Sequence, residues 1–408
     1  MCSDNFVEDL DNFVEDLPPA AEGAGQSRGS VQHAHPRSLT IMPTSACTAR
    51  CNDCGTFVGR CKISNLPLSV MLNAIDQAKV LNFQIVVFTG GEATLLWDNL
   101  LRAISHAASL GMPTRLVTNG HWAVEATTGR MLDQLVGAGL TEINFSTGDE
   151  HAKYVPIERV VAGIIASRAR NLTVHIMVET RAEKLISKET LLQHPEIIRA
   201  DCIRADNITE NPWMSLDPYE SEGMDPARAL NASNVGASMG CESVLSHYTL
   251  YPDGIIAGCC GLGQRAIAEL NVGMARGDDF LREATAVAED DYVKIWMKFM
   301  GPVKLLQWAA TKDETIAWEN AYAHKCQACL RAYLDPKVRK VVAEHFQELV
   351  PDLLLARFLD DELLPSISSP LLESLEPIEN DDMIDAAPAL VGDNSMENFS
   401  RRRRENRS

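Results

Sequence analysis

The chain has 408 residues, and its 56 acidic and 37 basic side chains give a formal net charge of −19. This balance argues against a nucleic-acid-binding groove and favours small or cationic partners, so we expect neither nucleic acid nor a membrane as a partner. No apolar stretch reaches the length of a membrane span, and the first residues are acidic where a signal peptide is basic. We expect a cytoplasmic protein, in which the eleven cysteines indicate metal ligands rather than disulfides.

Composition and periodicity predict five segments. Residues 1–37 form an acidic tail that we expect to be disordered, and in it the seven residues 4–10 are repeated at 11–17. A core domain spans 38–215, a smaller cysteine-bearing domain spans 216–335, and a helical extension spans 336–366. Residues 367–408 form a second disordered tail with an arginine run at 401–404, for which a solvated tail is the simplest interpretation.

Strand-like apolar runs alternate with segments of helical spacing in the core domain. The runs predict strands at 39–43, 84–88, 114–118, 142–145 and 172–178, and a shorter sixth strand at 202–205. Helices are expected between them, at 68–81, 97–110 and 130–138. This alternation predicts an α/β fold of βαβ units with buried parallel strands. In barrels of such strands, chemistry gathers at the carboxyl ends of the strands.

Three cysteines, Cys47, Cys51 and Cys54, stand as C-x3-C-x2-C directly after the first apolar run. A strand that opens into a loop lets three thiolates converge on one corner of a cubic iron–sulfur cluster, whose fourth iron then stays open to a substrate or cofactor. A zinc knuckle is the alternative, but zinc sites usually pair C-x2-C with a second such pair and close all four positions. The spacing therefore favours an iron–sulfur site.

A second motif, Gly90-Gly91-Glu92, follows the second apolar run. Two glycines at a strand end let the backbone approach a ligand closely, and a carboxylate beside them can hold an ammonium group. Together the two motifs resemble the radical S-adenosyl-L-methionine (SAM) superfamily, which implies a partial (β/α)6 barrel. The residues that the resemblance assigns are the [4Fe-4S] ligands Cys47, Cys51 and Cys54 and the SAM contacts Gly90, Gly91 and Glu92.

One position departs from the family pattern. The family usually has an aromatic residue just before the third cysteine, beside the adenine, whereas this chain has Asp53 there. Adenine contacts from that position could still come from the backbone. Phe57 is a possible substitute, although a core phenylalanine is the simpler interpretation.

Polar residues at three further strand ends are candidates for the cofactor site. Asn119, after the third strand, could face SAM or form an Asn-Gly turn. Ser146 ends the fourth strand, where the family often places a ribose-binding group, and Glu179 ends the fifth and could contact SAM or substrate. His151 could exchange a proton near the substrate, but a structural hydrogen bond is the commoner role for such a histidine.

A second cysteine set lies in the smaller domain. Cys241 is followed by a predicted hairpin, with strand-like residues 244–251 and a turn at 252–254, and then by Cys259 and Cys260. A C-x2-C pair, Cys326 and Cys329, comes later. The pattern resembles the single-cluster twitch form of the SPASM extension, a small C-terminal auxiliary-cluster domain. It implies a second [4Fe-4S] cluster on Cys241, Cys259, Cys326 and Cys329, and a zinc site with the same sulfurs is the alternative.

The resemblance implies an enzyme, a radical SAM oxidoreductase that cleaves SAM to a 5′-deoxyadenosyl radical and modifies a substrate by hydrogen abstraction. The expected substrates are a peptide or a small-molecule natural product, and the expected electron donor is a flavodoxin or ferredoxin. A fully ligated auxiliary cluster favours net oxidation. Two alternatives stay open: a redox-neutral epimerase in which Cys260 donates a hydrogen atom, and a zinc-binding protein without catalytic activity.

Overall fold

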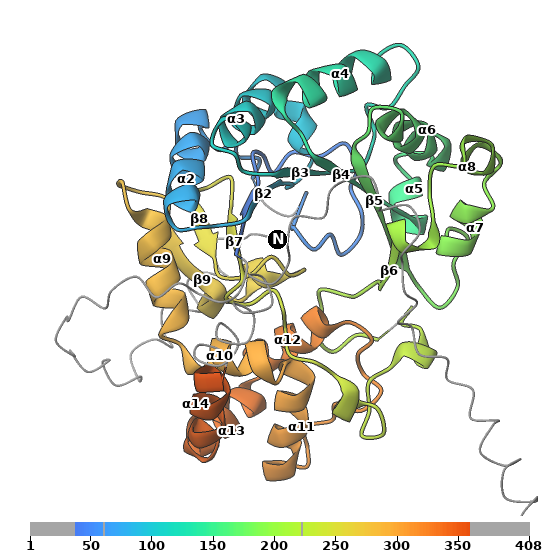
Figure 1. Cartoon of the computed structure of the whole chain (residues 1–408). Helices are drawn as coiled ribbons and strands as arrows, with labels where there is room; N and C mark the ends of the chain where they lie inside the picture. The colour runs from blue at the N-terminus through green and yellow to red at the C-terminus, as the bar shows by residue number, and fades with distance from the viewer. Residues whose placement is uncertain (1–36, 60–61, 222, 360–408) are drawn as a thin grey trace, which may run out of the picture. The chain divides into compact units, whose positions relative to one another are not determined.

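The computed structural model describes residues 37–59, 62–221 and 223–359. Three predicted features lie outside the described residues: the repeated seven residues, the arginine run and the tail at 367–408. The structure does not test the predictions for them. Residues 37–359 belong to one compact unit, which Figure 1 shows in colour.

The described part of the chain contains one sheet of nine strands, six of which form a consecutive parallel series. In chain order the six are β1 Ser38–Ile41, β2 Ile85–Phe88, β3 Thr114–Thr118, β4 Glu142–Gly148, β5 Thr173–Thr180 and β6 Ile208–Pro212. Each strand pairs in parallel with the next, giving the order β6-β5-β4-β3-β2-β1. The expected α/β class and parallel strands are confirmed. Because the order never reverses, right-handed connections place the helices on one face, as in a barrel.

Figure 1 shows helices on the outside of the curved parallel strands. The longer ones are α2 Leu68–Val80, α3 Trp97–Ser109, α4 Thr128–Ala138 and α6 Ile157–Arg168. Shorter helices are α5 Asp149–Ala152, α7 Lys188–Leu192 and α8 Pro195–Ala200. Strand β5 explains the layering, because Val174, Ile176 and Val178 are buried in the core while Met177 between them is 38% exposed. Alternate residues therefore face away from the helices, onto an inner face that is less tightly packed.

Three more strands extend the sheet from β1. They are β7 His247–Leu250, β8 Ile255–Ala257 and β9 Asn271–Met274. Strand β7 lies parallel to β1, with Ser38 opposite His247, and β8 and β9 follow in antiparallel pairing. The hairpin that the sequence assigned to the smaller domain is thus continuous with the parallel strands. Helix α9, Phe280–Glu289, packs on the same hydrophobic cluster as the parallel strands.

A second hydrophobic cluster is built from residues between 214 and 353. Its helices are α10 Tyr292–Phe299, α11 Pro302–Lys312, α12 Lys325–Leu334, α13 Pro336–His345 and α14 Val350–Phe358. Short 3₁₀ helices complete the described elements: η2 Ala93–Leu96, η3 Ala205–Asn207, η4 Pro226–Arg228, η5 Val235–Ala237, η6 Gln264–Ala266, η7 Ala268–Leu270 and η8 Phe346–Glu348. The helical extension predicted at 336–366 is helical over α13 and α14.

The structure differs from the predicted strand bounds by one or two residues at β1, β2 and β5, and β5 continues to Thr180, so Glu179 lies just inside it and does not end it. Larger differences occur in three places. The sixth strand begins at Ile208, beyond the predicted 202–205, because Asp201 ends α8 in a left-handed conformation and Arg204 then starts the turn of η3. Strand β4 continues to Gly148, so Ser146 lies inside it and does not end it. The predicted strand at 244–251 is shorter, with its ladder confined to His247–Leu250.

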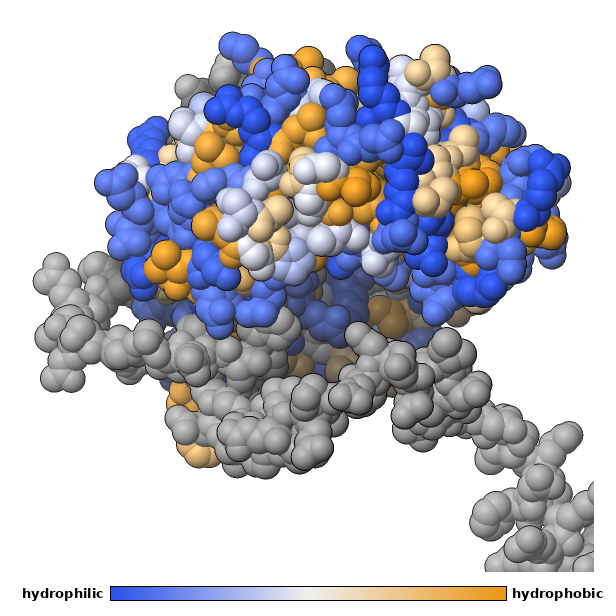
Figure 2. Space-filling model, turned by 45° about the horizontal axis from the view of Figure 1, so that its top comes forward, coloured by the Kyte–Doolittle hydropathy of each residue, from blue (hydrophilic) through white to orange (hydrophobic). Residues whose placement is uncertain are grey.

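Figure 2 shows hydrophilic side chains spread over the visible face, with apolar side chains in small groups among them. Leu185, Ile198 and Tyr219 are among the exposed large hydrophobic residues. Among the described residues, none of the helices has both the length and the apolar composition needed to cross a membrane.

The contact between α6 and β4 gives a stability prediction. A Cβ at Gly163 would lie 2.8 Å from Phe145 Cε1, whereas a Cβ at Gly137 in α4 would have no neighbour within 4 Å. Gly163→Ala should lower the free energy of unfolding by about 1–3 kcal/mol through overpacking. Gly137→Ala should raise it by about 0.5–1 kcal/mol. Chemical denaturation of both variants measures these unfolding free energies. Equal changes in the unfolding free energy of the two variants would contradict the tight α6–β4 contact.

Candidate functional site

The first three cysteines lie in the loop that follows β1, at the carboxyl end of the parallel strands. The Gly90-Gly91-Glu92 segment after β2 packs directly against the start of this loop. The Gly91 amide donates to Thr44 O at 3.0 Å, and the Glu92 amide donates to Ala46 O at 2.7 Å. A Cβ on Gly91 would overlap the Ala46 carbonyl group. Glycine is therefore required for the two backbones to meet one residue before Cys47.

The Glu92 carboxylate is held in a buried network, with only 1% of the residue exposed. Its Oε1 accepts from Thr94 N at 3.3 Å, Thr94 Oγ1 at 2.6 Å and Thr118 Oγ1 at 2.9 Å. Its Oε2 accepts from Asn119 N at 2.9 Å. All of these donors are neutral groups, so none of them offsets the carboxylate charge. A cationic group placed next to Glu92 would gain electrostatic energy in this low-dielectric environment.

Asn119 links the end of β3 to the cysteine loop. Its Nδ2 donates to Thr48 Oγ1 at 3.0 Å and approaches Cys47 Sγ at 3.6 Å. Its Oδ1 accepts from His121 N at 3.0 Å, which forms the turn that the Asn-Gly sequence predicted. The two interpretations of Asn119, a turn residue and a site residue, are therefore compatible: it makes the turn and contacts the residues around Cys47.

Burial makes thiolates costly at this loop. It raises the pKa of Cys47 to about 11 and, with help from the nearby Cys54 and Glu179, raises the pKa of Cys51 to about 12. A bound metal would supply the positive charge that ionises such thiols. Among the described residues, no three His, Cys, Asp or Glu side chains converge as ligands of one ion. A cubic cluster instead takes each thiolate on a different iron, and the three-cysteine loop fits that arrangement.

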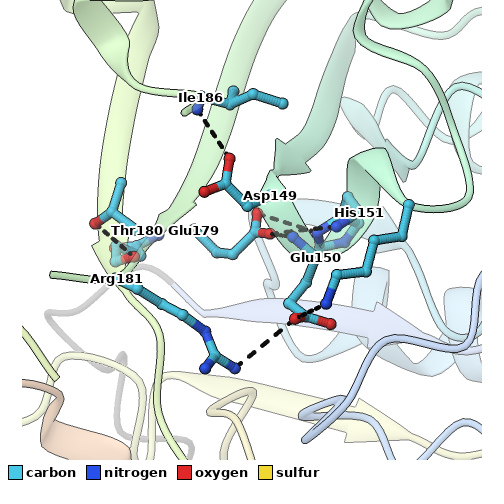
Figure 3. A network of polar contacts seen from close by, with 9 residues as sticks. Asp149, Glu150, His151, Glu179, Thr180, Arg181 and Ile186 are labelled. Carbon is cyan, nitrogen blue, oxygen red and sulfur yellow. Dashed lines mark hydrogen bonds and ion pairs between the residues drawn. The ribbon is translucent and has the colours of Figure 1, made fainter. Parts of the chain in front are cut away.

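The structure brings Glu179 and His151 together at the carboxyl ends of β4 and β5 (Figure 3). Glu179 Oε1 accepts from Glu150 N at 2.7 Å and from His151 N at 3.3 Å, and its Oε2 lies 3.1 Å from His151 Nδ1. Gly148, with φ 134°, makes room for this carboxylate, because a Cβ there would overlap it. Glu179 therefore fixes the turn after β4 and orients the His151 ring. Ser146 is half-buried in β4, two residues before the strand ends.

This polar group borders the cysteine loop. Tyr154 Oη donates to Arg50 O at 2.7 Å, next to Cys51. Glu150 pairs with Lys153 and lies 3.9 Å from Arg181, as Figure 3 shows. The charges of Glu179 and Glu150 also contribute to the raised pKa of Cys51. Acidic groups of β5 and α5 thus act on the three-cysteine loop.

The second set of cysteines surrounds one pocket. All four predicted ligands line it, together with apolar side chains and Lys325: Cys241, Cys259, Cys326 and Cys329. Burial raises the pKa of Cys326 to about 12, and it also raises the pKa values of Cys259 and Cys329 well above the usual range of a thiol. A Cβ on Gly261 would lie 3.0 Å from Cys326 Sγ and 3.2 Å from Cys259 Sγ, so glycine leaves space between these sulfurs. Four thiols in an apolar pocket suit a cluster with four cysteine ligands.

Cys260 does not line this pocket. Its residue is exposed, and its thiol donates to Ser243 Oγ at 3.6 Å. Adjacent residues thus turn their sulfurs in different directions, Cys259 into the pocket and Cys260 out of it. Of these two cysteines, the one that the resemblance assigns as a ligand, Cys259, is the one that lines the pocket.

The two cysteine sites are joined by direct contacts between their loops. The Gly263 amide donates to Gly55 O at 2.9 Å, and a Cβ on Gly55 would lie 2.8 Å from Leu262 Cβ. Asp53, directly before the third cysteine, adopts φ 52° and accepts from Leu216 N at 3.3 Å. Asp53 therefore ties the first cysteine loop to the segment around Leu216.

Sequence reasoning missed three residues that shape these sites. Thr94 and Thr118 hold the Glu92 carboxylate, and a threonine at a strand end or after a turn carries no distinctive signal. Lys325 lines the four-cysteine pocket, and its position beside Cys326 was the only available indication.

No protein-family model matches the chain, and no curated protein matches it. Among solved structures, it is similar to native anSMEcpe with bound AdoMet and the Kp18Cys peptide, with 14% identity, TM-score 0.48, and coverage of 79% of this chain and 99% of that one. It is also similar to Streptococcus suis SuiB bound to precursor peptide SuiA, with 12% identity, TM-score 0.47, and coverage of 70% of this chain and 76% of that one. BtrN in complex with AdoMet and 2-DOIA is similar with 13% identity, TM-score 0.40, and coverage of 66% of this chain and 89% of that one. Because these TM-scores lie below 0.5, we infer function from this chain's own residues.

The backbone contact at Gly91 gives a prediction for metal content. Gly91→Ala should displace residues 44–46 and, with them, Cys47, because the new Cβ overlaps the Ala46 carbonyl. Anaerobically reconstituted protein should then lose about half of its iron, that of the first site only. Gly236→Ala is the control, since a Cβ there has no neighbour within 4 Å. An unchanged iron content in Gly91→Ala would contradict the role of this contact.

Proposed function

We propose that the chain is a radical SAM enzyme with two iron–sulfur clusters. The observation that carries the proposal is the packing of the C-x3-C-x2-C loop against Gly91 and Glu92 at the carboxyl end of a consecutive parallel sheet. The loop offers three thiols that fit three corners of a cubic cluster. Beside them lies a buried carboxylate whose hydrogen-bond partners are neutral. Together these residues suit a cluster with one open iron and a cationic amino-acid ligand on that iron.

In this proposal each residue of the first site has a role. Cys47, Cys51 and Cys54 bind the first [4Fe-4S] cluster, and the Glu92 charge stabilises the ammonium of SAM. Gly90 and Gly91 bring the backbone against the cysteine loop. When bound, the cluster and SAM supply the radical chemistry: a 5′-deoxyadenosyl radical that abstracts a hydrogen atom from the substrate. Asn119, Ser146 and Glu179 border the SAM site, with Glu179 acting through the turn after β4.

The second site supports an auxiliary cluster and therefore an oxidoreductase. Four cysteines line its pocket, so a cluster bound there has no open iron for substrate. Such a cluster suits electron transfer, which makes net oxidation of a peptide or small-molecule substrate the preferred reaction. The single four-cysteine pocket is also the arrangement that the twitch form requires. A cytoplasmic flavodoxin or ferredoxin is the proposed electron donor.

One observation favours a second candidate reaction. Cys260 is exposed and turned away from the four-cysteine pocket, so its thiol is available to a radical. A hydrogen atom returned by Cys260 would make the reaction a redox-neutral epimerisation. Net oxidation remains preferred because four cysteines gather at the second pocket, whereas a lone exposed cysteine is by itself a weak signal.

The metal content tests the enzyme proposal. Reconstituted protein should contain two [4Fe-4S] clusters, about eight irons per chain. Replacing Cys47, Cys51 and Cys54 together by Ala should remove about four irons and abolish formation of 5′-deoxyadenosine, because the ligands of the open-iron cluster are gone. Replacing Cys326 and Cys329 should leave SAM cleavage measurable. Stoichiometric zinc without iron in anaerobically purified protein would instead favour the non-catalytic zinc-binding alternative.

A second test concerns Glu92. Glu92→Gln removes the charge that pairs with the SAM ammonium, so SAM binding should weaken by roughly 1.5–3 kcal/mol. It also turns an amide nitrogen toward backbone donors, which should lower the unfolding free energy by about 1–3 kcal/mol. Anaerobic calorimetry measures SAM binding, and thermal denaturation measures stability. Glu142→Gln, at the amino end of β4 beside Arg115, is the matched control and should leave SAM affinity unchanged. Equal SAM affinities in the two variants would remove Glu92 from the site.

A further inference from the structure

We infer that Lys325 raises the reduction potential of a cluster held by Cys241, Cys259, Cys326 and Cys329. The inference rests on the proposed function and deepens it, because it names a residue that would set the potential of the auxiliary site.

The position of Lys325 carries the inference. It is the first residue of α12, directly before Cys326, and it lines the four-cysteine pocket. Its Nζ donates to Gly240 O at 3.1 Å, and Gly240 directly precedes Cys241. The ammonium is therefore held between two segments that each supply a ligand.

The anchor of the ammonium is itself fixed. A Cβ on Gly240 would overlap the Lys298 carbonyl group, so this glycine packs tightly against the end of α10. The next residue, Cys241, donates its amide to Met297 O at 2.9 Å. Both contacts hold the Gly240 carbonyl in place, and with it the hydrogen-bonded end of the Lys325 side chain.

Lys325 is the charged member of the pocket lining. The other described residues that line it are cysteines, Gln264, glycine or proline, and apolar side chains such as Val244, Leu270 and Met297. A cluster with four thiolate ligands carries net negative charge, and its reduction adds one more negative charge. In an apolar pocket this charge is weakly screened, so a nearby ammonium favours the reduced form. The consequence is a higher reduction potential.

The electron count of the proposed oxidation fits this direction. Hydrogen abstraction leaves a carbon radical on the substrate. Loss of one electron from that radical, and of one proton from the neighbouring heteroatom, forms the double bond of the product. A cluster held by Cys241, Cys259, Cys326 and Cys329 would supply the electron acceptor for this loss, and the proton would pass to solvent. An acceptor stabilised by a fixed positive charge drives this step forward.

A redox titration tests the inference without a known substrate. The full-length chain with Cys47, Cys51 and Cys54 replaced by Ala carries only the second cluster, whose reduced form is followed by electron paramagnetic resonance. Lys325→Met keeps the apolar stem and removes the charge, so the midpoint potential should fall. Lys325→Arg keeps the charge and should remain near the parent value. Lys340→Met on α13, beside Glu344, is the control for loss of one lysine elsewhere.

The outcomes separate the inference from the proposed function. A lower potential in Lys325→Met, with Lys325→Arg and Lys340→Met near the parent, supports the inference. Equal potentials in Lys325→Met and Lys340→Met overturn it. If Lys325→Met does not retain the cluster, Lys325→Gln, whose amide can still reach toward Gly240 O, takes its place under the same criterion. A parent chain that holds zinc and no iron at this pocket refutes the proposed auxiliary cluster, and the inference falls with it.

Discussion

The close approach of two backbone segments, 44–46 and 90–92, is the constraint on which the site depends. The Gly91 and Glu92 amides donate to carbonyls of the cysteine loop, and this contact tolerates no Cβ at Gly91. It fixes the start of the loop one residue before Cys47. The same segment places Glu92 where Thr118 and Asn119 can hold its carboxylate, so one contact positions both a thiol and a buried charge.

Strand β1 connects this constraint to the second site. It pairs with β2 on one side and with β7 on the other, both in parallel. The loop after β1 carries the first three cysteines, and the β7–β8 hairpin leads to Cys259. A contact between Gly55 and Gly263 then joins the two loops directly. The relation between the two cysteine sites therefore follows from sheet pairing and one loop contact. Distant parts of the chain could not assemble the sites in this way without the shared strand.

The sequence predicted the α/β fold class and the first five strands, because periodicity is a local signal. The cysteine spacing predicted two ligand groups, and the four cysteines of the second group line one pocket. It misplaced the sixth strand, since the left-handed Asp201 and the turn at Arg204 lie in a segment whose apolar residues mimic a short strand. It could not predict that β7 joins β1, because pairing between distant strands leaves no local pattern. It also could not reveal how Glu179 acts. Only the structure shows that this carboxylate is occupied by the turn after β4 and by His151.

The charges that act on the two cysteine sites differ, and this difference suits the proposed chemistry. The charges of Glu179 and Glu150 act on the Cys51 thiol, and that of Glu92 acts on the Cys47 thiol. At the second pocket Glu269 acts on the Cys329 thiol, but Lys325 in the pocket lining acts on the Cys326 thiol with the opposite sign. Negative charge near a cluster disfavours the addition of an electron, and positive charge favours it. A cluster at the first site would therefore be the stronger reductant, as SAM cleavage requires, and a cluster at the second would be the better acceptor. The contact between Gly55 and Gly263 joins the two cysteine loops directly. Under the proposed function, one fold would therefore hold both a reducing cluster and an electron-accepting one.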